Sequence, residues 1–166
     1  MELLIVRHGP AVDRAKWANA GRRDAERPLT ADGRRRAKAS ASGLRAAFGR
    51  ADLVASSPWK RAAQTAALVA EALDAPRASC PALLPSRPFE DLAAWLGARR
   101  EKRIALVGHE PHLSGFASWL MTGGARPVVR LKKSQALLLE LDSPARGTAT
   151  LVWSLPPRQL RALAGD

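Results

Sequence analysis

The chain has 166 residues, of which 46% are hydrophobic and 25% are charged. This balance is typical of one globular domain and excludes a disordered or fibrous protein. The formal net charge of +12 arises from 27 basic against 15 acidic residues. Because the basic residues are scattered, without a block or an aromatic-interleaved stripe, we interpret them as solvated helix faces that also attract anionic substrates, and we do not expect nucleic acid as a partner.

We expect no secretory signal at the start of the chain. An apolar run at residues 3–6 follows the first two residues directly, without a basic leader or a small-residue cleavage site. Elsewhere no stretch approaches the roughly 18 to 20 apolar residues that span a bilayer. Cys80 is the single cysteine and cannot form a disulfide within the chain, which agrees with a reducing compartment. These features predict a cytoplasmic protein without a membrane partner.

The predicted elements begin with a strand at residues 3–6, because an unbroken apolar run is typical of a strand covered on both faces. Residues 10–28 show no periodicity and predict a long loop, which in a compact domain is usually functional or mobile. Thr30 is a typical helix N-cap and Gly49 a typical C-terminal stop. The helix between them has apolar residues at helical spacing, namely Ala37, Ala41, Leu44 and Phe48.

Strands and helices continue to alternate in the rest of the chain. A short strand at residues 52–55 leads into a helix with Pro58 in its first turn, and a weaker strand near residues 78–84 is interrupted by Pro81. Further predicted elements are helices around residues 89–96 and 113–120, strands at residues 103–107, 136–141 and 149–153, and a short helix at the C-terminal end. This alternation predicts an α/β fold, a three-layer αβα sandwich with a mostly parallel central sheet, in one domain over residues 1–166.

Three predicted strands are followed by polar residues with one shared chemical preference. The segments are Arg7-His8-Gly9, Ser56-Ser57 with Arg61 one helical turn later, and Gly108-His109-Glu110. Because ligands of α/β sheets bind beyond the carboxyl ends of the strands, we expect these side chains to converge at one rim. Arginines and helix N-termini suit a dianion such as a phosphoryl group. One histidine can act as a neutral nucleophile, and the other, if protonated, can hold the charge that develops on the transferred group.

Four motifs in a fixed order carry a resemblance to a known family. They are RHG at residues 7–9, RPLTADG at 27–33, SSPWKRAAQTA at 56–66 and LVGHEP at 106–111. Together they resemble the histidine phosphatase superfamily, also called phosphoglycerate-mutase-like. The short length and the segment GHEPHLSG resemble its small SixA-type phosphohistidine phosphatases in particular. The resemblance implies the phosphoglycerate-mutase-like fold and a metal-independent phosphatase that requires no cofactor.

The resemblance also implies roles for individual residues. His8 matches the nucleophile that is phosphorylated during turnover, and Arg7, Arg61 and His109 match the pocket around the phosphoryl group. Gly9 permits close approach of the backbone to the substrate, and Ser57 either touches the phosphate or caps the following helix. Residues expected to have no catalytic role are Thr30, Gly33, Lys60, Gln64, Thr65 and His112.

The general acid is the point at which the sequence departs from the larger members of the family. Those members place a carboxylic acid in a loop before the fourth strand, whereas acid phosphatase branches place it directly after the second histidine. The candidates here are Glu110, in the second position, and Glu90 or Asp91, at the start of a predicted helix. Glu110 is equally explained as a carboxylate that stabilises a helix N-terminus. A phosphorylated imidazole has a weak P–N bond and an easily protonated leaving nitrogen, so its hydrolysis can also proceed without an acid.

We therefore interpret the chain as a phosphatase for phosphohistidine in a protein. The loop at residues 10–28 is either a solvated loop, which we favour, or part of a docking surface for that protein. One alternative is a phosphomonoesterase for a small sugar or nucleotide phosphate. An alternative from another class is a non-catalytic module that binds anions or nucleic acid. Metal ligands are not indicated, because the arginines beside the two histidines oppose a cation there. The sequence leaves the oligomeric state open.

Overall fold

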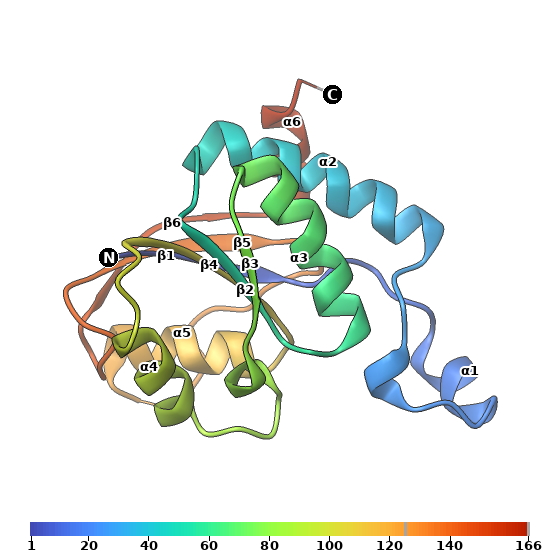
Figure 1. Cartoon of the computed structure of the whole chain (residues 1–166), viewed down its shortest axis with the longest axis horizontal. Helices are drawn as coiled ribbons and strands as arrows, with labels where there is room; N and C mark the ends of the chain where they lie inside the picture. Colours follow the sequence, from blue (N-terminus) through green and yellow to red (C-terminus); the bar gives the residue numbers. More distant parts are fainter. Residues whose placement is uncertain (125, 166) are drawn as a thin grey trace.

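A computed structural model describes residues 1–124 and 126–165. A central sheet lies between two layers of helices, with α2, α3 and α6 on one face and α4 and α5 on the other (Figure 1). In chain order the elements are β1 (Glu2–Arg7), α1 (Arg14–Asn19), the 3-10 helix η1 (Asp24–Glu26), α2 (Ala31–Phe48), β2 (Leu53–Ser56), α3 (Lys60–Leu73), β3 (Arg77–Ser79), the 3-10 helix η2 (Pro81–Leu83), α4 (Phe89–Gly97), β4 (Arg103–Gly108), α5 (His112–Thr122), β5 (Ala136–Leu141), β6 (Ala149–Leu155) and α6 (Pro157–Leu163). The predicted αβα sandwich is confirmed.

The six strands are arranged in the order β3-β2-β4-β1-β5-β6. The first four are parallel to one another. Strand β5 pairs antiparallel with β1, and β6 pairs antiparallel with β5. The prediction of a mostly parallel sheet is therefore correct. In the part of the chain that the structure describes, no helix combines the length and the apolar character needed to cross a membrane.

Strand β1 is buried on both faces, as its unbroken apolar run predicts. Leu3 and Ile5 pack in the core shared with α4 and α5, whereas Leu4 and Val6 pack in the core shared with α2 and α3. Full burial of one such side chain contributes about 1.5–3 kcal/mol to stability. Four of them in succession therefore fix the position of the residue that follows the strand, His8.

The ends of the helices follow the sequence signals, with one exception. Thr30 Oγ1 accepts a hydrogen bond from the Gly33 amide at 2.9 Å, and Gly49, with a φ of 85°, ends α2. Both predictions are confirmed. Pro58 lies before α3 rather than in its first turn, because Trp59 is the N-cap of that helix. The weak strand predicted near residues 78–84 is divided into β3 and η2.

The prediction of a long loop at residues 10–28 is wrong in part. The segment contains α1 and η1, and Figure 1 shows α1 apart from the three layers. Asp13 caps α1 by accepting a hydrogen bond from the Lys16 amide at 2.9 Å, and the Trp17 indole donates to the Arg23 carbonyl at 2.9 Å. Because α1 has no buried residue, it has no apolar stripe, and a search for helical periodicity cannot detect it.

Gly33, in the RPLTADG motif, allows α2 to lie directly against the segment that follows His8. A Cβ at this position would lie 1.9 Å from the Pro10 carbonyl oxygen. We expect Gly33→Ala to lower the free energy of unfolding by about 1–3 kcal/mol, because backbone must move to relieve the overlap. Urea denaturation measures this effect. Ser42→Ala, on the exposed side of the same helix, should change stability by less than about 0.5 kcal/mol, and equal effects of the two variants would contradict the steric argument.

Candidate active site

The two histidines of the site lie side by side because adjacent parallel strands end in register. Arg7 of β1 pairs with Gly108 of β4, so the next residues, His8 and His109, leave the same edge of the sheet together. Their ring centroids lie 5.2 Å apart. Strand β2 pairs with β4 on its other side, Ser56 opposite Val107, and delivers Ser57 to the same edge. The convergence expected from the sequence is thus present.

The two ring nitrogens of His8 differ in protonation, and each has a hydrogen-bond partner. Its Nδ1 lies 2.7 Å from the Gly9 carbonyl oxygen, an acceptor, so Nδ1 carries the proton. Nε2 is then unprotonated, and it accepts a hydrogen bond from Arg61 Nε at 3.2 Å. Burial, opposed by the Gly9 hydrogen bond and reinforced by nearby arginine charges, lowers the pKa of His8 to about 3. His8 is therefore a neutral imidazole at physiological pH, with a lone pair on Nε2.

His109 is held by Ser57, which follows β2, and by Trp59, the N-cap of α3. Its Nε2 lies 2.9 Å from Ser57 Oγ, and its ring centroid lies 4.8 Å from that of Trp59. Burial and then the positive charge of Arg61 lower the pKa of His109 to about 2. Binding of a phosphoryl dianion beside it would oppose this shift, because a nearby negative charge favours the protonated imidazole.

Two arginines face this pair of histidines and are fixed in place by other groups. Arg61, only 4% exposed, donates from Nη1 to the Asp24 carbonyl and from Nη2 to the Asp24 carboxylate, in addition to its bond with His8. Three of its five N–H donors are thus occupied, which leaves two for a ligand. Arg7 donates from Nη1 to the Leu131 carbonyl at 2.7 Å. Burial lowers the pKa of both guanidiniums, yet arginine remains charged in proteins.

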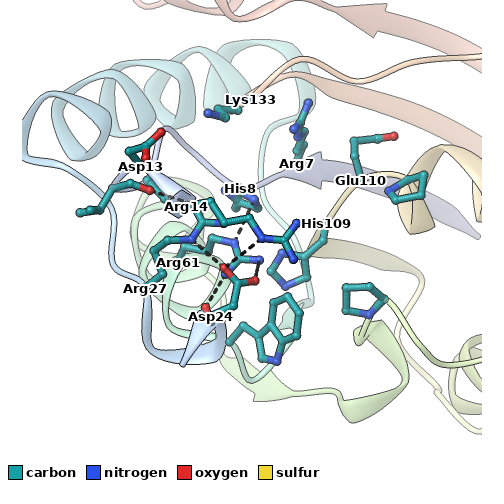
Figure 2. A pocket seen from close by; sticks show the side chains of 15 residues that line it. Arg7, His8, Asp13, Arg14, Asp24, Arg27, Arg61, His109, Glu110 and Lys133 are labelled. Carbon is teal, nitrogen blue, oxygen red and sulfur yellow. Dashed lines mark hydrogen bonds and ion pairs between the residues drawn. The ribbon is translucent and has the colours of Figure 1, made fainter. Parts of the chain in front are cut away.

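Asp24 and Arg27 belong to the site, and sequence reasoning missed both. Asp24 lies among the basic side chains in Figure 2, bound by Arg61 at 3.1 Å and by Arg27 at 2.8 Å. Arg27 also donates to the Val12 carbonyl at 2.8 Å, which ties the two ends of the segment at residues 10–28 together. Burial acts to raise the pKa of Asp24, but the hydrogen bond from Arg27 and the surrounding arginine charges lower it overall. Asp24 is therefore a carboxylate at neutral pH, and its ion pairs orient Arg61 and Arg27.

These groups surround one cavity of about 580 Å³. Its lining residues are Arg7, His8, Ala11, Val12, Asp13, Arg14, Asp24, Arg27, Trp59, Arg61, Pro85, His109, Glu110, Pro111 and Lys133. Five of them are basic side chains other than histidine, against three carboxylates. The cavity therefore suits an anionic ligand. Among the described residues, no three His, Cys, Asp or Glu side chains gather closely enough to hold a metal ion.

Gly9 and Ser57, both predicted to bind substrate, are not among the residues that line the cavity. The Gly9 amide donates to Thr65 Oγ1 at 3.0 Å, and a Cβ on Gly9 would lie 3.0 Å from the Ala37 Cβ of α2. Gly9 therefore permits close packing against α2.

Ser57 is fully buried and contacts the His109 ring. It accepts a hydrogen bond from the Trp59 amide but is not the N-cap of α3. Ser57 therefore contacts the ring of His109 and does not line the cavity.

Of the three candidate acids, the structure brings only Glu110 to the cavity. Glu110 is half-buried and accepts a hydrogen bond from Ser114 Oγ at 2.7 Å. Burial raises its pKa, and the Ser114 hydrogen bond and the Arg7 charge only partly oppose this. Glu90 is exposed and Asp91 pairs with Arg87 at 2.6 Å. The alternatives Glu90 and Asp91 therefore lie outside the cavity.

The buried histidines predict a specific dependence of stability on pH. Burial lowers the pKa of His8 to about 3, that of His109 to about 2, and that of His112 in the same direction. Below about pH 6.5 the unfolded chain takes up protons that the folded chain cannot, so stability is full above this pH and falls as pH decreases. We expect the free energy of unfolding to drop by about 3 kcal/mol or more between pH 7 and 5.

Denaturant titrations at several pH values measure this dependence. The His8→Asn variant has one buried imidazole fewer, so its stability should fall less steeply over the same range, by up to about 1.4 kcal/mol per pH unit. Identical slopes for the two proteins, or a flat profile for the wild type, would show that the histidines are not held neutral by burial.

Comparisons with known proteins agree with this geometry. The model of the histidine phosphatase superfamily (branch 1) matches residues 3–84. An uncharacterized protein of Picosynechococcus sp. is 35% identical over 138 residues, which cover 81% of each chain. The structure of the protein histidine phosphatase SixA complexed with tungstate is 27% identical, with a TM-score of 0.80 over 96% of this chain and 99% of the other. The alpha-ribazole phosphatase from Shigella flexneri shares the fold at 19% identity, with a TM-score of 0.70 over 95% of this chain and 97% of the other. The chain therefore belongs to the histidine phosphatase superfamily, as a SixA-type member of this group of phosphatases with a histidine nucleophile.

Proposed function

We propose that the protein hydrolyses phosphohistidine in a protein substrate, with His8 as the nucleophile. The observation that carries this proposal is the state of His8: a neutral imidazole whose Nδ1 proton is bound to the Gly9 carbonyl, so that Nε2 keeps its lone pair. Nε2 lies at the cavity lined by Arg7 and His109, and it attacks once it gives up the hydrogen bond from Arg61 Nε. A nucleophile that is neutral and oriented by a hydrogen bond on its other nitrogen meets the usual requirements for covalent catalysis.

Two displacements at phosphorus follow from this arrangement. In the first, the Nε2 lone pair of His8 forms a bond to phosphorus as the bond from phosphorus to the substrate nitrogen breaks, and the leaving nitrogen takes a proton. In the second, a water oxygen forms a bond to phosphorus as the bond from phosphorus to His8 Nε2 breaks. The attacking water passes a proton to solvent, and inorganic phosphate and the neutral imidazole of His8 are released. The remaining donors of Arg61 and Arg7 stabilise the charge on the equatorial oxygens in both steps. His109 adds to this stabilisation when the bound phosphoryl dianion favours its protonated form.

The substrate class is argued from the leaving group and from the similarity to SixA. Imidazole leaves phosphorus easily once protonated, so positioning and charge stabilisation supply most of what its hydrolysis requires. The structure of the protein histidine phosphatase SixA is similar to this chain over nearly its whole length. Both observations support a protein-borne phosphohistidine. The cytoplasmic location expected from the single cysteine stays a prediction.

Glu110 favours a second candidate, a phosphomonoesterase for a small sugar or nucleotide phosphate. An alkoxide leaving group requires an acid, and Glu110 lies at the cavity with its pKa raised by burial. The structural neighbours include a phosphatase of a small molecule, the alpha-ribazole phosphatase.

The variant Glu110→Gln separates the two roles of this carboxyl group. With an alkyl phosphate ester as substrate, we expect kcat to fall by about 10²-fold or more, because the donor of a proton to the alkoxide is lost. With phosphoramidate or a phosphohistidine peptide, the rate should change by less than about threefold, since the leaving nitrogen is protonated by water. Steady-state kinetics on both substrates measure the ratio. Equal, undiminished rates on both would remove Glu110 as the acid.

The proposed function is tested with the purified protein and a panel of substrates in the presence of a chelator. The panel contains a phosphohistidine peptide, sugar phosphates and nucleotides, compared by kcat/KM. We expect the highest value for the phosphohistidine peptide. A higher value for a sugar phosphate or nucleotide would instead support the phosphomonoesterase, and no turnover of any substrate would contradict both.

A further inference from the structure

A second cavity, here called the basic groove, has a volume of about 290 Å³. It lies beside the cavity around His8 and His109, here called the catalytic cavity. The basic groove is formed by the start of α6, by α2 and by the turn that precedes β5. Its lining residues are Pro10, Arg36, Lys132, Lys133, Ser134, Pro156, Pro157, Arg158 and Arg161. Five of these side chains are basic and none is acidic. The groove therefore presents an uncompensated positive charge.

The basic residues of the groove differ from the scattered basic residues elsewhere because they gather around one cavity. Some exposed arginines elsewhere pair with carboxylates, as Arg35 does with Asp32 and Arg50 with Asp74, whereas others, such as Arg45, form no ion pair in the described ranges but do not line the groove. Within the groove, Arg36 pairs with Asp32. The other four basic residues form no ion pair with any residue in the described ranges. Because these like charges lie around one hollow without a partner, an anionic ligand would relieve their mutual repulsion.

The basic groove is continuous with the catalytic cavity through Lys133, which lines both. In Figure 2 Lys133 lies on the opposite side of His8 from Asp24. The turn that carries Lys133 is fixed to the end of β1. The amide of the next residue, Ser134, donates to the Arg7 carbonyl at 3.1 Å and to the His8 carbonyl at 3.3 Å. A ligand in the groove and a phosphoryl group on His8 are therefore held in a defined relation.

The opposite wall of the basic groove is equally well fixed. Helix α6 packs on α2 through Leu160, which is fully buried, and a Cβ on Gly43 of α2 would lie 1.8 Å from the Leu160 carbonyl oxygen. Arg158 and Arg161 are three positions apart on α6 and so lie on one face of that helix. The groove is thus a built feature of the fold, formed by segments that are far apart in the sequence.

We propose that the basic groove binds acidic side chains of the protein that carries the phosphohistidine, next to the phosphorylated residue. This inference rests on the proposed function, since a small phosphate ester fits within the catalytic cavity alone and has no extension to reach past Lys133. A peptide or protein surface does extend beyond the phosphoryl group. Carboxylates on that extension complement the unpaired lysines and arginines, which raises the association rate and fixes the orientation of the substrate.

The test compares two phosphohistidine peptides that differ only in the residues beside the phosphohistidine, glutamate in one and glutamine in the other. At low salt the wild type should have a KM about tenfold lower for the glutamate peptide, with similar kcat, because the groove acts on binding rather than on the chemical step. This preference should shrink as salt is raised. The triple variant Lys132→Gln, Arg158→Gln, Arg161→Gln should lose the preference and keep its kinetics on p-nitrophenyl phosphate.

A matched control removes the same charge elsewhere. The triple variant Arg45→Gln, Arg77→Gln, Arg100→Gln changes three exposed residues outside both cavities and should keep the preference. An equal loss in this control, or equal KM values of the wild type for the two peptides, would overturn the groove assignment while phosphohistidine hydrolysis stands. Inhibition by a single-stranded oligonucleotide as strong as that by an acidic peptide of equal charge would also overturn it. Turnover of p-nitrophenyl phosphate with no turnover of either peptide would instead overturn the proposed function.

Discussion

Replacement of His8 by asparagine is expected to lower kcat by about 10⁴-fold or more, because no other group can form the covalent intermediate and the residual rate depends on charge stabilisation alone. Asparagine keeps a polar side chain that can donate to the Gly9 carbonyl, the partner of His8 Nδ1. We therefore expect the variant to fold, with a near-ultraviolet circular dichroism spectrum and a urea m-value close to those of the wild type. Single-turnover kinetics on a phosphohistidine peptide measure the loss.

His112 provides a matched control for His8. It is also a buried histidine, but its Nε2 lies 3.1 Å from the Arg87 carbonyl and it does not line the catalytic cavity. The variant His112→Asn should lose stability and keep kcat within about threefold of the wild type. If His8→Asn turned over at a rate near that of the wild type, the assignment of the nucleophile would be wrong.

Arg61→Lys is expected to have the second largest effect, a decrease of about 10²- to 10³-fold in kcat/KM. The guanidinium simultaneously donates to His8 Nε2, to the Asp24 carbonyl and to the Asp24 carboxylate. A lysine ammonium is a compact point charge and cannot make these bonds while it also contacts the phosphoryl oxygens. Retention of the positive charge with loss of activity would show that the planar, multidentate geometry is what the site requires.

Lys60, the exposed residue before Arg61, is the natural control for this variant. Lys60→Gln removes a charge from the same helix turn without contact with His8, so kcat/KM should change by less than about threefold. A similar loss in Lys60→Gln and Arg61→Lys would mean that net charge, rather than the arrangement around His8, determines the rate.

Most of the fold and the central part of the site could be predicted from the sequence, because both are encoded locally. The apolar run of β1 leads directly into Arg7 and His8, and β4 leads into His109 in the same way. In a parallel sheet, such strand ends meet at one edge. The placement of these residues therefore required only the recognition of buried strands and of the polar residues after them.

The parts of the site that could not be predicted depend on tertiary contacts, which leave no local pattern in the sequence. Asp24 and Arg27 lie in a segment without apolar periodicity, and only the pairing with Arg61 brings them to the cavity. The motif RPLTADG includes Arg27, but helix capping by Thr30 explains its polar residues without reference to the site. The position of Lys133 depends on the turn before β5 and its bonds to the Arg7 and His8 carbonyls. The sequence predicts that Gly9 allows the substrate to approach the backbone. In the structure it allows α2 to pack closely against the backbone at Gly9.

The most direct measurement of the central claim is the detection of a phosphoryl group on His8 during turnover. The wild-type protein would be mixed with a phosphohistidine peptide and quenched rapidly in base, since phosphohistidine is labile in acid, and its own peptides would be analysed by mass spectrometry. We expect one added phosphoryl group, on the peptide that contains His8, with inorganic phosphate appearing as this species decays. A phosphoryl group located on another residue, or phosphate release without any phosphorylated protein, would contradict the account.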